Sequence, residues 1–484
     1  MSNLFNNRQV LSVQRGFTAG ATAPGWFARN RSASTIVMLS GLAFTAFFLE
    51  SDHAVGVFYR AAIGIGLTLG ICTAIESAGG VRNLIRVDIL CIWALYGLTF
   101  LEFLFPHPEV DTLVSPASAL NGTYAVFLGF AGLALGRHLV PRRARKKMAT
   151  TIDVDSASIF LLFIFATLVG YFHVFLAVNF DPFEVLRQMS LPRFSQTWGR
   201  GRYGDAYSLL FELGALIYLI PPIAGLVYAR SQKYSFLQKI VVTIVLLFTF
   251  YYGFASGTRN ILATYVIMFL GAYFLNKPGL KLWQVVGQGV PVIALLFLVM
   301  TYMLEFRNAG LGNFSFEAPL PGTVFIDHNM VIIARLTDLF PDVYGYLGFE
   351  IPYLGLIHPI PRVFWPGKPE GMSVSIEAAL GANASTVTFA CTYIGEAYLS
   401  GGLLGVLLAS LIMGMLAEMW NRVGRNVHSQ YSQLLYASGF LCAALTMRSM
   451  MWASVTMLPT VALWVYGKLW LPRSTLRRSD APEI

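Results

Sequence analysis

The chain has 484 residues, of which 56% are hydrophobic and 12% are charged. A typical soluble domain carries about 25% charged residues, so most of this surface cannot face water, and a soluble or secreted enzyme is excluded. The net charge of +9 does not indicate nucleic-acid binding, because the basic residues lie in short clusters between apolar runs, as the orientation signals of membrane proteins do.

Apolar residues come in long uncharged runs, such as residues 158–178, 240–255, 290–304 and 403–416. A helix needs about 20 apolar residues to cross a hydrocarbon core of about 30 Å, and most of these runs reach that length with their flanks. We therefore predict an all-α polytopic membrane protein with about 12 transmembrane helices. The predicted spans begin near Ser34, Ala54, Asp88, Leu120, Ser156, Ser208, Lys239, Asn260, Val285, Phe389, Gln430 and Met451.

In chain order, these spans divide the sequence into five parts. The predicted parts are a cytoplasmic N-terminal segment without a cleavable signal peptide (1–33), the first nine transmembrane helices (34–304), a large periplasmic loop between helices 9 and 10 (305–388), the last three transmembrane helices (389–471) and a cytoplasmic tail (472–484). Within the loop, residues 329–340 form an amphipathic helix candidate. The four cysteines, Cys72, Cys91, Cys391 and Cys442, are interpreted as small apolar fillers rather than as disulfide or metal ligands.

Basic residues predict the orientation, because Lys and Arg favour cytoplasmic connections. The strongest cluster spans residues 137–147, and every alternate connection counted from it is basic too, at residues 82–86, 230–239, 277–281 and 422–425. Both chain termini then fall on the cytoplasmic side.

The opposite face departs from this rule, because it carries nine Arg and one Lys. Guanidinium groups bind phosphate bidentately and keep their charge at any relevant pH, so an Arg-rich outer cleft indicates an anionic substrate such as a diphosphate. The alternative, that these side chains pair with lipid headgroups or with nearby acids, stays open. The ten residues are Arg187, Arg193, Arg200, Arg202, Arg259, Arg307, Arg335, Arg362, Lys368 and Arg448.

Arg259 lies in a polar turn between two apolar runs. Gly257 permits a tight reversal, and Thr258 is a candidate cap for the helix that follows. The unpaired N–H groups and positive dipole end of that helix would form a compact anion site with Arg259. The alternative is an arginine that snorkels to the membrane interface.

Two further clusters carry candidate chemistry. Arg362 and Lys368 lie in a stiff segment with three prolines and two aromatic residues, which is typical of a lipid interface. Glu396 lies close to membrane depth, where an ionisable group is costly and is either functional or paired with an arginine. His328 and His358 are candidates for proton handling, although a lone loop histidine is more often simply solvated. We expect no metal and no cofactor, since no histidine has metal-ligand spacing and no phosphate-binding or dinucleotide motif is present.

Three segments together resemble the oligosaccharide repeat-unit polymerases, or O-antigen polymerases, of bacterial polysaccharide assembly. They are Ser-Gly-Thr-Arg at 256–259, Pro-Arg-Val-Phe-Trp-Pro-Gly-Lys-Pro at 361–369 and Gly-Glu-Ala-Tyr-Leu-Ser-Gly-Gly at 395–402. The likeness covers residues 256–416 at the level of motifs, and the middle segment is the most specific. The N-terminal half agrees only in consisting of many spans.

The resemblance implies a glycosyltransferase on the periplasmic face of the bacterial inner membrane. It would transfer a growing glycan, of O-antigen or exopolysaccharide, from undecaprenyl diphosphate to a lipid-linked repeat unit. Expected partners are this lipid-linked oligosaccharide, a chain-length regulator and a flippase, and no nucleic acid. The expected roles are diphosphate binding by Arg259 and Arg362 with help from Arg307, Arg335 and Lys368, base catalysis by Glu396, His328 or His358, and shaping of the sugar site by Tyr398.

Two rival functions stay open. An O-antigen ligase uses the same donor with a lipid A core acceptor, and the Pro-Arg-aromatic-Trp-Pro motif favours the polymerase over it. A secondary transporter or a lipid-linked oligosaccharide flippase is the rival from a different class. The loop at 305–388 has no counterpart in the other half of the chain, which argues against a transporter. Residues 76–87 lack the basic signature expected of the major facilitator group. Residues 421–425 resemble that signature, but they lie in a different connection.

Overall fold

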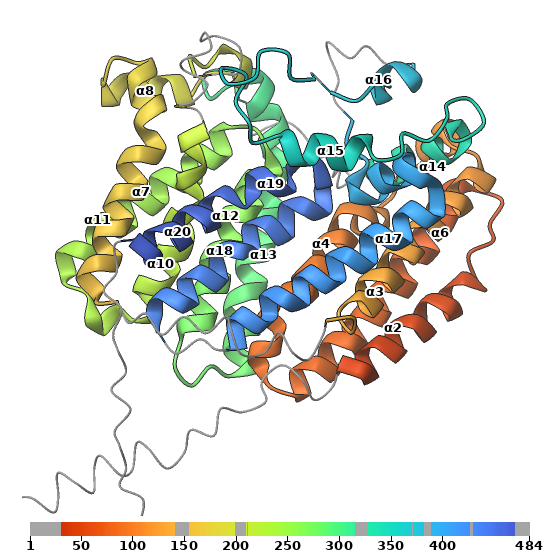
Figure 1. Ribbon diagram of the computed structural model, residues 1–484, viewed down its shortest axis with the longest axis horizontal. Helices are drawn as coiled ribbons and strands as arrows, with labels where there is room; N and C mark the ends of the chain where they lie inside the picture. The colour runs from red at the N-terminus through yellow and green to blue at the C-terminus, as the bar shows by residue number, and fades with distance from the viewer. Residues whose placement is uncertain are drawn as a thin grey trace, which may run out of the picture.

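The computed structural model describes residues 31–140, 154–198, 210, 212–314, 328–369, 371–381, 389–425 and 429–469. These residues form helices and connecting turns, and no strand occurs among them, which confirms the all-α fold. Figure 1 shows a bundle of tilted helices. The end that carries α8 (Pro182–Met189), α15 (Glu350–Ile357) and α16 (Ile376–Ala379) is named the upper end here, and the opposite end the lower end.

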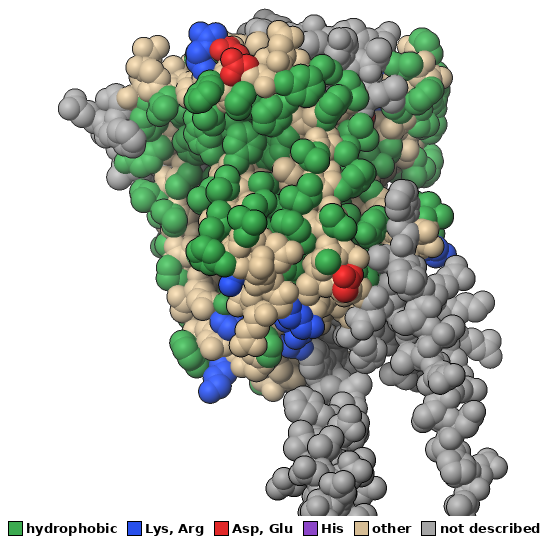
Figure 2. All heavy atoms as spheres, turned by 90° about the vertical axis from the view of Figure 1, so that its left-hand side faces the viewer, with side chains coloured by type: hydrophobic (Ala, Val, Ile, Leu, Met, Phe, Trp, Pro, Cys, Tyr) green, Lys and Arg blue, Asp and Glu red, His purple; other side chains and the backbone are tan. Residues whose placement is uncertain are grey.

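Six helical segments of the described residues are long and apolar enough to cross a membrane. Figure 2 shows a broad band of apolar side chains on the face formed by α7 and α11, with Lys and Arg gathered below it. Exposed Leu161, Phe165 and Leu247 belong to this face, as expected for helices that face lipid. The six segments are α3 (Ala54–Ala78), α6 (Pro116–Gly136), α7 (Ser156–Ala177), α11 (Phe236–Ala255), α17 (Thr392–Arg425) and the run Met450–Leu469, which comprises η7 (Met450–Trp452), α19 (Ala453–Thr456) and α20 (Leu458–Leu469).

The predicted count of twelve spans is therefore not supported. Helices do lie at the other predicted positions. The described part of α13 contributes an apolar stretch at Leu282–Leu296, and the other helices are too short, or too polar along their length, to qualify as spans. The 13 residues of α4 (Val87–Thr99) rise about 20 Å, which is less than a hydrocarbon core of about 30 Å. These helices are α2 (Arg31–Ala46), α4 (Val87–Thr99), α10 (Ile220–Ala229) with η5 (Gly214–Leu219), α12 (Arg259–Asn276), α13 (Leu282–Ala309) and α18 (Gln430–Arg448).

Two hydrophobic cores share the pair of helices α12 and α18. One core joins α2, α3, α4, α6 and α17, and the other joins α7, α10 and α11. Met268 of α12 and Phe440 of α18 belong to the first core, whereas Tyr265 and Leu434 of the same two helices belong to the second. The helices α12 and α18 thus lie in the middle of the bundle, between the two cores.

A buried ionic cluster ties the lower end together. The Arg86 guanidinium donates to both carboxylate oxygens of Asp88 and, at 2.7 Å, to Glu76. Arg137 donates to Glu76 at 3.1 Å and to Asp88 at 3.2 Å, and Asn421 of α17 donates to Asp88 at 2.6 Å. All four charged side chains are at most 2% exposed. Residues that the sequence marks only as orientation signals therefore form interhelical ion pairs.

The helix α17 is broken at Gly401 and Gly402. The hydroxyl groups of Tyr393 and Ser410 lie 3.0 Å apart, although a continuous helix would separate two residues at this spacing by about 25 Å along its axis. The segment before the break therefore folds back against the segment after it. Both segments pack on α6, where Gly129 faces Ile394 and Gly132 faces Ser410, so the first segment, named here the folded-back limb (392–400), lies at the depth of a spanning helix.

The predicted amphipathic helix at residues 329–340 is present as α14 (Asn329–Leu339). It is buried on most sides rather than on one, because it packs against α6 and the folded-back limb. A β-carbon on Gly122 of α6 would lie 2.8 Å from the Cα of Ala334, and the Asn329 amide donates to the carbonyl oxygen of Leu98 at 2.7 Å. Part of the predicted external loop therefore packs inside the bundle.

Candidate functional site

The helices α12 and α18 bring their charged ends to the upper end of the bundle. Arg82, in the connection after α3, donates to the carbonyl oxygen of Lys277 just beyond α12, which fixes the last turn of α12 at the lower end and Arg259 at the upper end. A β-carbon on Gly271 would collide with Phe440, so α12 packs directly on α18. The Tyr436 hydroxyl, in the first half of α18, donates to the carbonyl oxygen of Ile85 at the lower end, so Arg448, the last residue of α18, lies at the same end as Arg259.

A second arginine, from a different helix, packs on the turn before Arg259. Gly257 has a φ of +61°, and a β-carbon there would lie 2.8 Å from both Cβ and Cγ of Arg307. The stem of Arg307 thus packs directly over this turn. Thr258 occupies the N-cap position without a side-chain cap bond, contrary to the prediction, and its hydroxyl donates instead to the carbonyl oxygen of Ser256 at 3.4 Å.

Arg362 and Lys368 stabilise the loop in which they lie, named here the Pro-Arg loop (358–369). Arg362 donates to the carbonyl oxygens of Lys368 at 2.9 Å and Pro369 at 3.2 Å. The Lys368 ammonium donates to the carbonyl oxygens of His358 at 2.8 Å and Ile360 at 3.0 Å. Burial, followed by the nearby charge of Arg362, lowers the pKa of Lys368. These bonds close residues 358–369 into a compact loop, so the two cations have a structural role whatever else they bind.

Glu396 lies on the folded-back limb and is 5% exposed. Its carboxylate accepts hydrogen bonds from the Ser449 hydroxyl, from the backbone N–H of Met450 at 2.6 Å and from that of Met451 at 3.3 Å. These donors belong to the break between α18 and α19, where Ser449 is extended. Arg448 adds an electrostatic interaction with the same carboxylate. Glu396 therefore holds the break in place.

The segment α15 covers this break from above. The Ser454 hydroxyl donates to the carbonyl oxygen of Gly355, and the rings of His358 and Trp452 lie 4.6 Å apart. Since Lys368 bonds to the backbone of His358, four predicted residues meet around the break between α18 and α19: Glu396, His358, Arg362 and Lys368. The same cluster contains three residues that were not predicted as site residues: Arg448, Ser449 and Trp452. The one sequence signal for them is a lone arginine at the end of an apolar run.

The remaining predicted residues lie on α14 and on the folded-back limb. Arg335 donates to the carbonyl oxygen of Leu380 at 3.4 Å, and the Tyr398 hydroxyl donates to that of Phe340 at 3.3 Å. His328, just before α14, has its ring 5.8 Å from that of His107.

Other basic residues of the predicted outer face differ in their surroundings. Arg187 is an exposed surface residue whose guanidinium pairs with Glu184 at 2.6 Å. Arg200 and Arg202 lie outside the described residues, as do the predicted terminal segments up to residue 30 and from residue 470. Among the residues that the structure describes, no group of three or more His, Cys, Asp or Glu is arranged to hold a metal ion.

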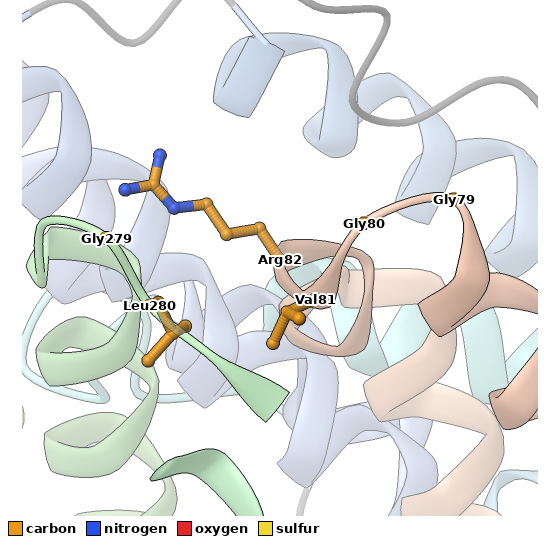
Figure 3. A pocket seen from close by; sticks show the side chains of 6 residues that line it. All are labelled: Gly79, Gly80, Val81, Arg82, Gly279 and Leu280. Atoms are coloured by element: carbon orange, nitrogen blue, oxygen red, sulfur yellow. The ribbon is translucent and has the colours of Figure 1, made fainter. Parts of the chain in front are cut away.

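A pocket of about 290 Å³ lies at the lower end, between the turn that follows α3 and the turn that follows α12 (Figure 3). None of the predicted site residues lines it. The lining residues are Gly79, Gly80, Val81, Arg82, Gly279 and Leu280.

One family model covers part of this site. The family described as domain of unknown function DUF8712 matches residues 328–452. The match runs from His328 to Trp452 and includes α14, α15, the Pro-Arg loop, Glu396 and the break after α18. No curated protein and no solved structure matches the chain.

Proposed function

We propose that the chain is an oligosaccharide repeat-unit polymerase, a glycosyltransferase that transfers a growing glycan from undecaprenyl diphosphate to a lipid-linked repeat unit. In this proposal the upper end faces the periplasm of a bacterial inner membrane, and both chain termini are cytoplasmic. The observation that carries the proposal is the packing of Arg307 over the Gly257 turn, which brings it beside Arg259. Two guanidinium groups at one turn suit a diphosphate.

Two further features support this assignment. Arg448 ends α18 at the same end of the bundle, on the helix that packs against α12. The three segments that resemble repeat-unit polymerases all reach the upper end, although they are separated by up to 139 residues of sequence between positions 257 and 396. In this proposal they act together on a substrate in the upper leaflet.

In the proposed reaction, a hydroxyl oxygen of the acceptor attacks the anomeric carbon of the donor sugar, and the bond from that carbon to the diphosphate oxygen breaks. Arg259 and Arg307 stabilise the negative charge that develops on the departing undecaprenyl diphosphate. We assign His358 rather than Glu396 to receive the hydroxyl proton, because the Glu396 carboxylate already accepts three hydrogen bonds. Arg362 and Lys368 hold the loop that positions His358.

Substitution of the two arginines tests the proposal. We expect Arg259→Ala and Arg307→Ala each to reduce long-chain polymer by about 100-fold or more at unchanged protein level in the membrane, measured by gel analysis of the extracted glycan. Arg187→Ala is the matched control, since Arg187 is an exposed arginine of the same end that pairs with Glu184. Normal polymer length in both arginine variants would refute the assignment.

A flippase or secondary transporter is the second candidate, because two helical segments are discontinuous: α17 at Gly402 and the α18–α19 segment at Ser449. Broken helices line the substrate sites of many transporters. Deletion of the protein separates the functions. Loss of a polymerase leaves single repeat units on the outer leaflet, whereas loss of a flippase traps lipid-linked repeats on the inner leaflet. A ligase is distinguished by a product joined to lipid A core.

A further inference from the structure

The lower-end pocket lies between two turns that come from distant parts of the chain. One turn joins α3 to η1 (Val81–Ile85), and the other joins α12 to α13. In Figure 3 the Arg82 side chain extends from η1 toward the α12–α13 turn, where one of its nitrogens donates to the carbonyl oxygen of Lys277. A cationic side chain therefore spans the pocket from one turn to the other.

Glycines keep the walls of the pocket open. Gly80 has a φ of +135° and Gly279 a φ of +62°, which are conformations that L side chains rarely adopt, and nothing lies within 4 Å of a β-carbon placed on either. Turns of this kind let a ligand approach the backbone closely. A pocket of about 290 Å³ is at the small end of ligand sites, which typically span about 300–1,000 Å³, and so suits a single headgroup rather than a nucleotide.

A second arginine acts electrostatically on the arginine that lines this pocket. Arg82 interacts electrostatically with Arg230, which follows α10 and is therefore a like-charged neighbour from a third segment. The Nε–H of Arg230 is buried and has no hydrogen-bond partner among the described residues. Like charges that are held together and partly desolvated repel each other, and an anion between them relieves the repulsion. An unpaired buried N–H is a second indication of a missing acceptor.

We propose that this pocket binds the phosphate group of an anionic phospholipid in the leaflet at the lower end, with Arg82, which lines it, as the cationic ligand and Arg230 as a neighbouring positive charge. The pocket opens directly beyond Ala78, where the spanning helix α3 ends, so it lies at headgroup level for a lipid beside the bundle. Basic pockets between helices at the cytoplasmic face are suited to anionic lipid headgroups. The proposal concerns the end of the bundle opposite Arg259 and does not depend on the polymerase assignment.

Equilibrium binding to the full-length protein in non-ionic detergent tests the site. The probes are short-chain phosphatidylglycerol, short-chain phosphatidylcholine and inorganic phosphate. We expect saturable binding of phosphatidylglycerol that is at least about tenfold tighter than that of phosphatidylcholine, and a loss of about tenfold or more in Arg82→Gln and in Arg230→Gln, as for a charge-assisted hydrogen bond. The Nε–H that Arg230→Gln removes has no described hydrogen-bond partner, so this substitution breaks no described hydrogen bond of that group. It therefore keeps the test valid if Arg82→Gln fails to fold.

Lys233→Gln is the matched control, because Lys233 is an exposed basic residue three positions from Arg230 at the same end. Its affinity for phosphatidylglycerol should equal that of the unsubstituted protein. Competition by inorganic phosphate would show that the pocket recognises the phosphate group itself. It would also show that the pocket accepts this group from a soluble ion as well as from a lipid. Equal affinity for the two lipids would overturn the proposal, as would an equal loss in Lys233→Gln, because binding would then reflect diffuse surface charge.

Discussion

His328 is held in an unusual conformation at the first residue of the family match. Its φ of +50° lies in the left-handed region, which is uncommon for residues other than Gly, although His, Asn and Asp adopt it more often than the rest. Burial lowers its pKa, and the neighbouring charge of His107 lowers it further. The folded protein therefore favours the neutral imidazole, whereas the unfolded chain titrates near 6.5.

This difference in pKa predicts a stability that depends on pH. As the pH falls below 6.5, the unfolded chain binds a proton at His328 before the folded protein does, so the free energy of unfolding decreases. His328→Asn keeps a side chain that tolerates the left-handed region but removes the titration. We expect the drop in unfolding temperature between pH 7.5 and pH 5.5 to be smaller in His328→Asn, and an unchanged drop would show that His328 is not its source.

At the scale of elements, the break in α17 depends on one glycine rather than on two. Gly402 has a φ of +60° and a ψ of −148°, which is accessible essentially to glycine alone, whereas Gly401 has a φ of −174°, which any residue adopts. The folded-back limb carries Glu396, so the geometry of this turn also sets where the carboxylate meets the α18–α19 break.

Two alanine substitutions form a matched pair at this turn. We expect Gly402→Ala to lower the free energy of unfolding by about 1–3 kcal/mol through backbone strain. A steric clash adds to this strain, because a β-carbon at position 402 would lie 2.5 Å from the Tyr346 hydroxyl. Gly401→Ala should change it little, since nothing lies within 4 Å of its β-carbon. Thermal unfolding in detergent measures both. Equal effects of the two substitutions would contradict this description of the turn.

At the scale of the whole molecule, the buried ionic cluster joins α3, α4 and α6 to α17 across more than 330 residues of sequence. Burying charges is costly, and removing one partner of a buried pair costs about 3–5 kcal/mol because the other charge stays uncompensated. Arg86 has no exposed side-chain surface and pairs with two carboxylates.

The cluster therefore predicts a large effect of one substitution. We expect Arg86→Leu to lower the free energy of unfolding by about 3–5 kcal/mol, measured by thermal or denaturant unfolding in detergent. Arg187→Leu serves as the control, because its ion pair is exposed and contributes little. A loss in Arg86→Leu no larger than that of the control would show that the cluster is not a stabilising element.

The sequence alone predicts a helical membrane protein, because long apolar runs and a low content of charged residues can be seen without knowledge of the fold. It also located α14, since its pattern is helical. The predicted number of spans was wrong because some apolar runs form helices too short to cross a membrane, such as α4, and others form helices that are too polar along their length, such as α12 and α18. The sequence selected Glu396 as a candidate base, whereas its three hydrogen bonds to the α18–α19 break led us to assign the proton to His358 in the proposed reaction.

Only the tertiary structure decided which partners these residues meet. Glu396 takes its donors from residues 53 to 55 positions later in the chain, and Arg307 packs on the turn before Arg259 from a different helix. The fold-back of α17 follows from the backbone angles of Gly402 together with its packing on α6. Contacts of this kind depend on helix packing between distant segments, and local periodicity and hydropathy carry no information about that packing.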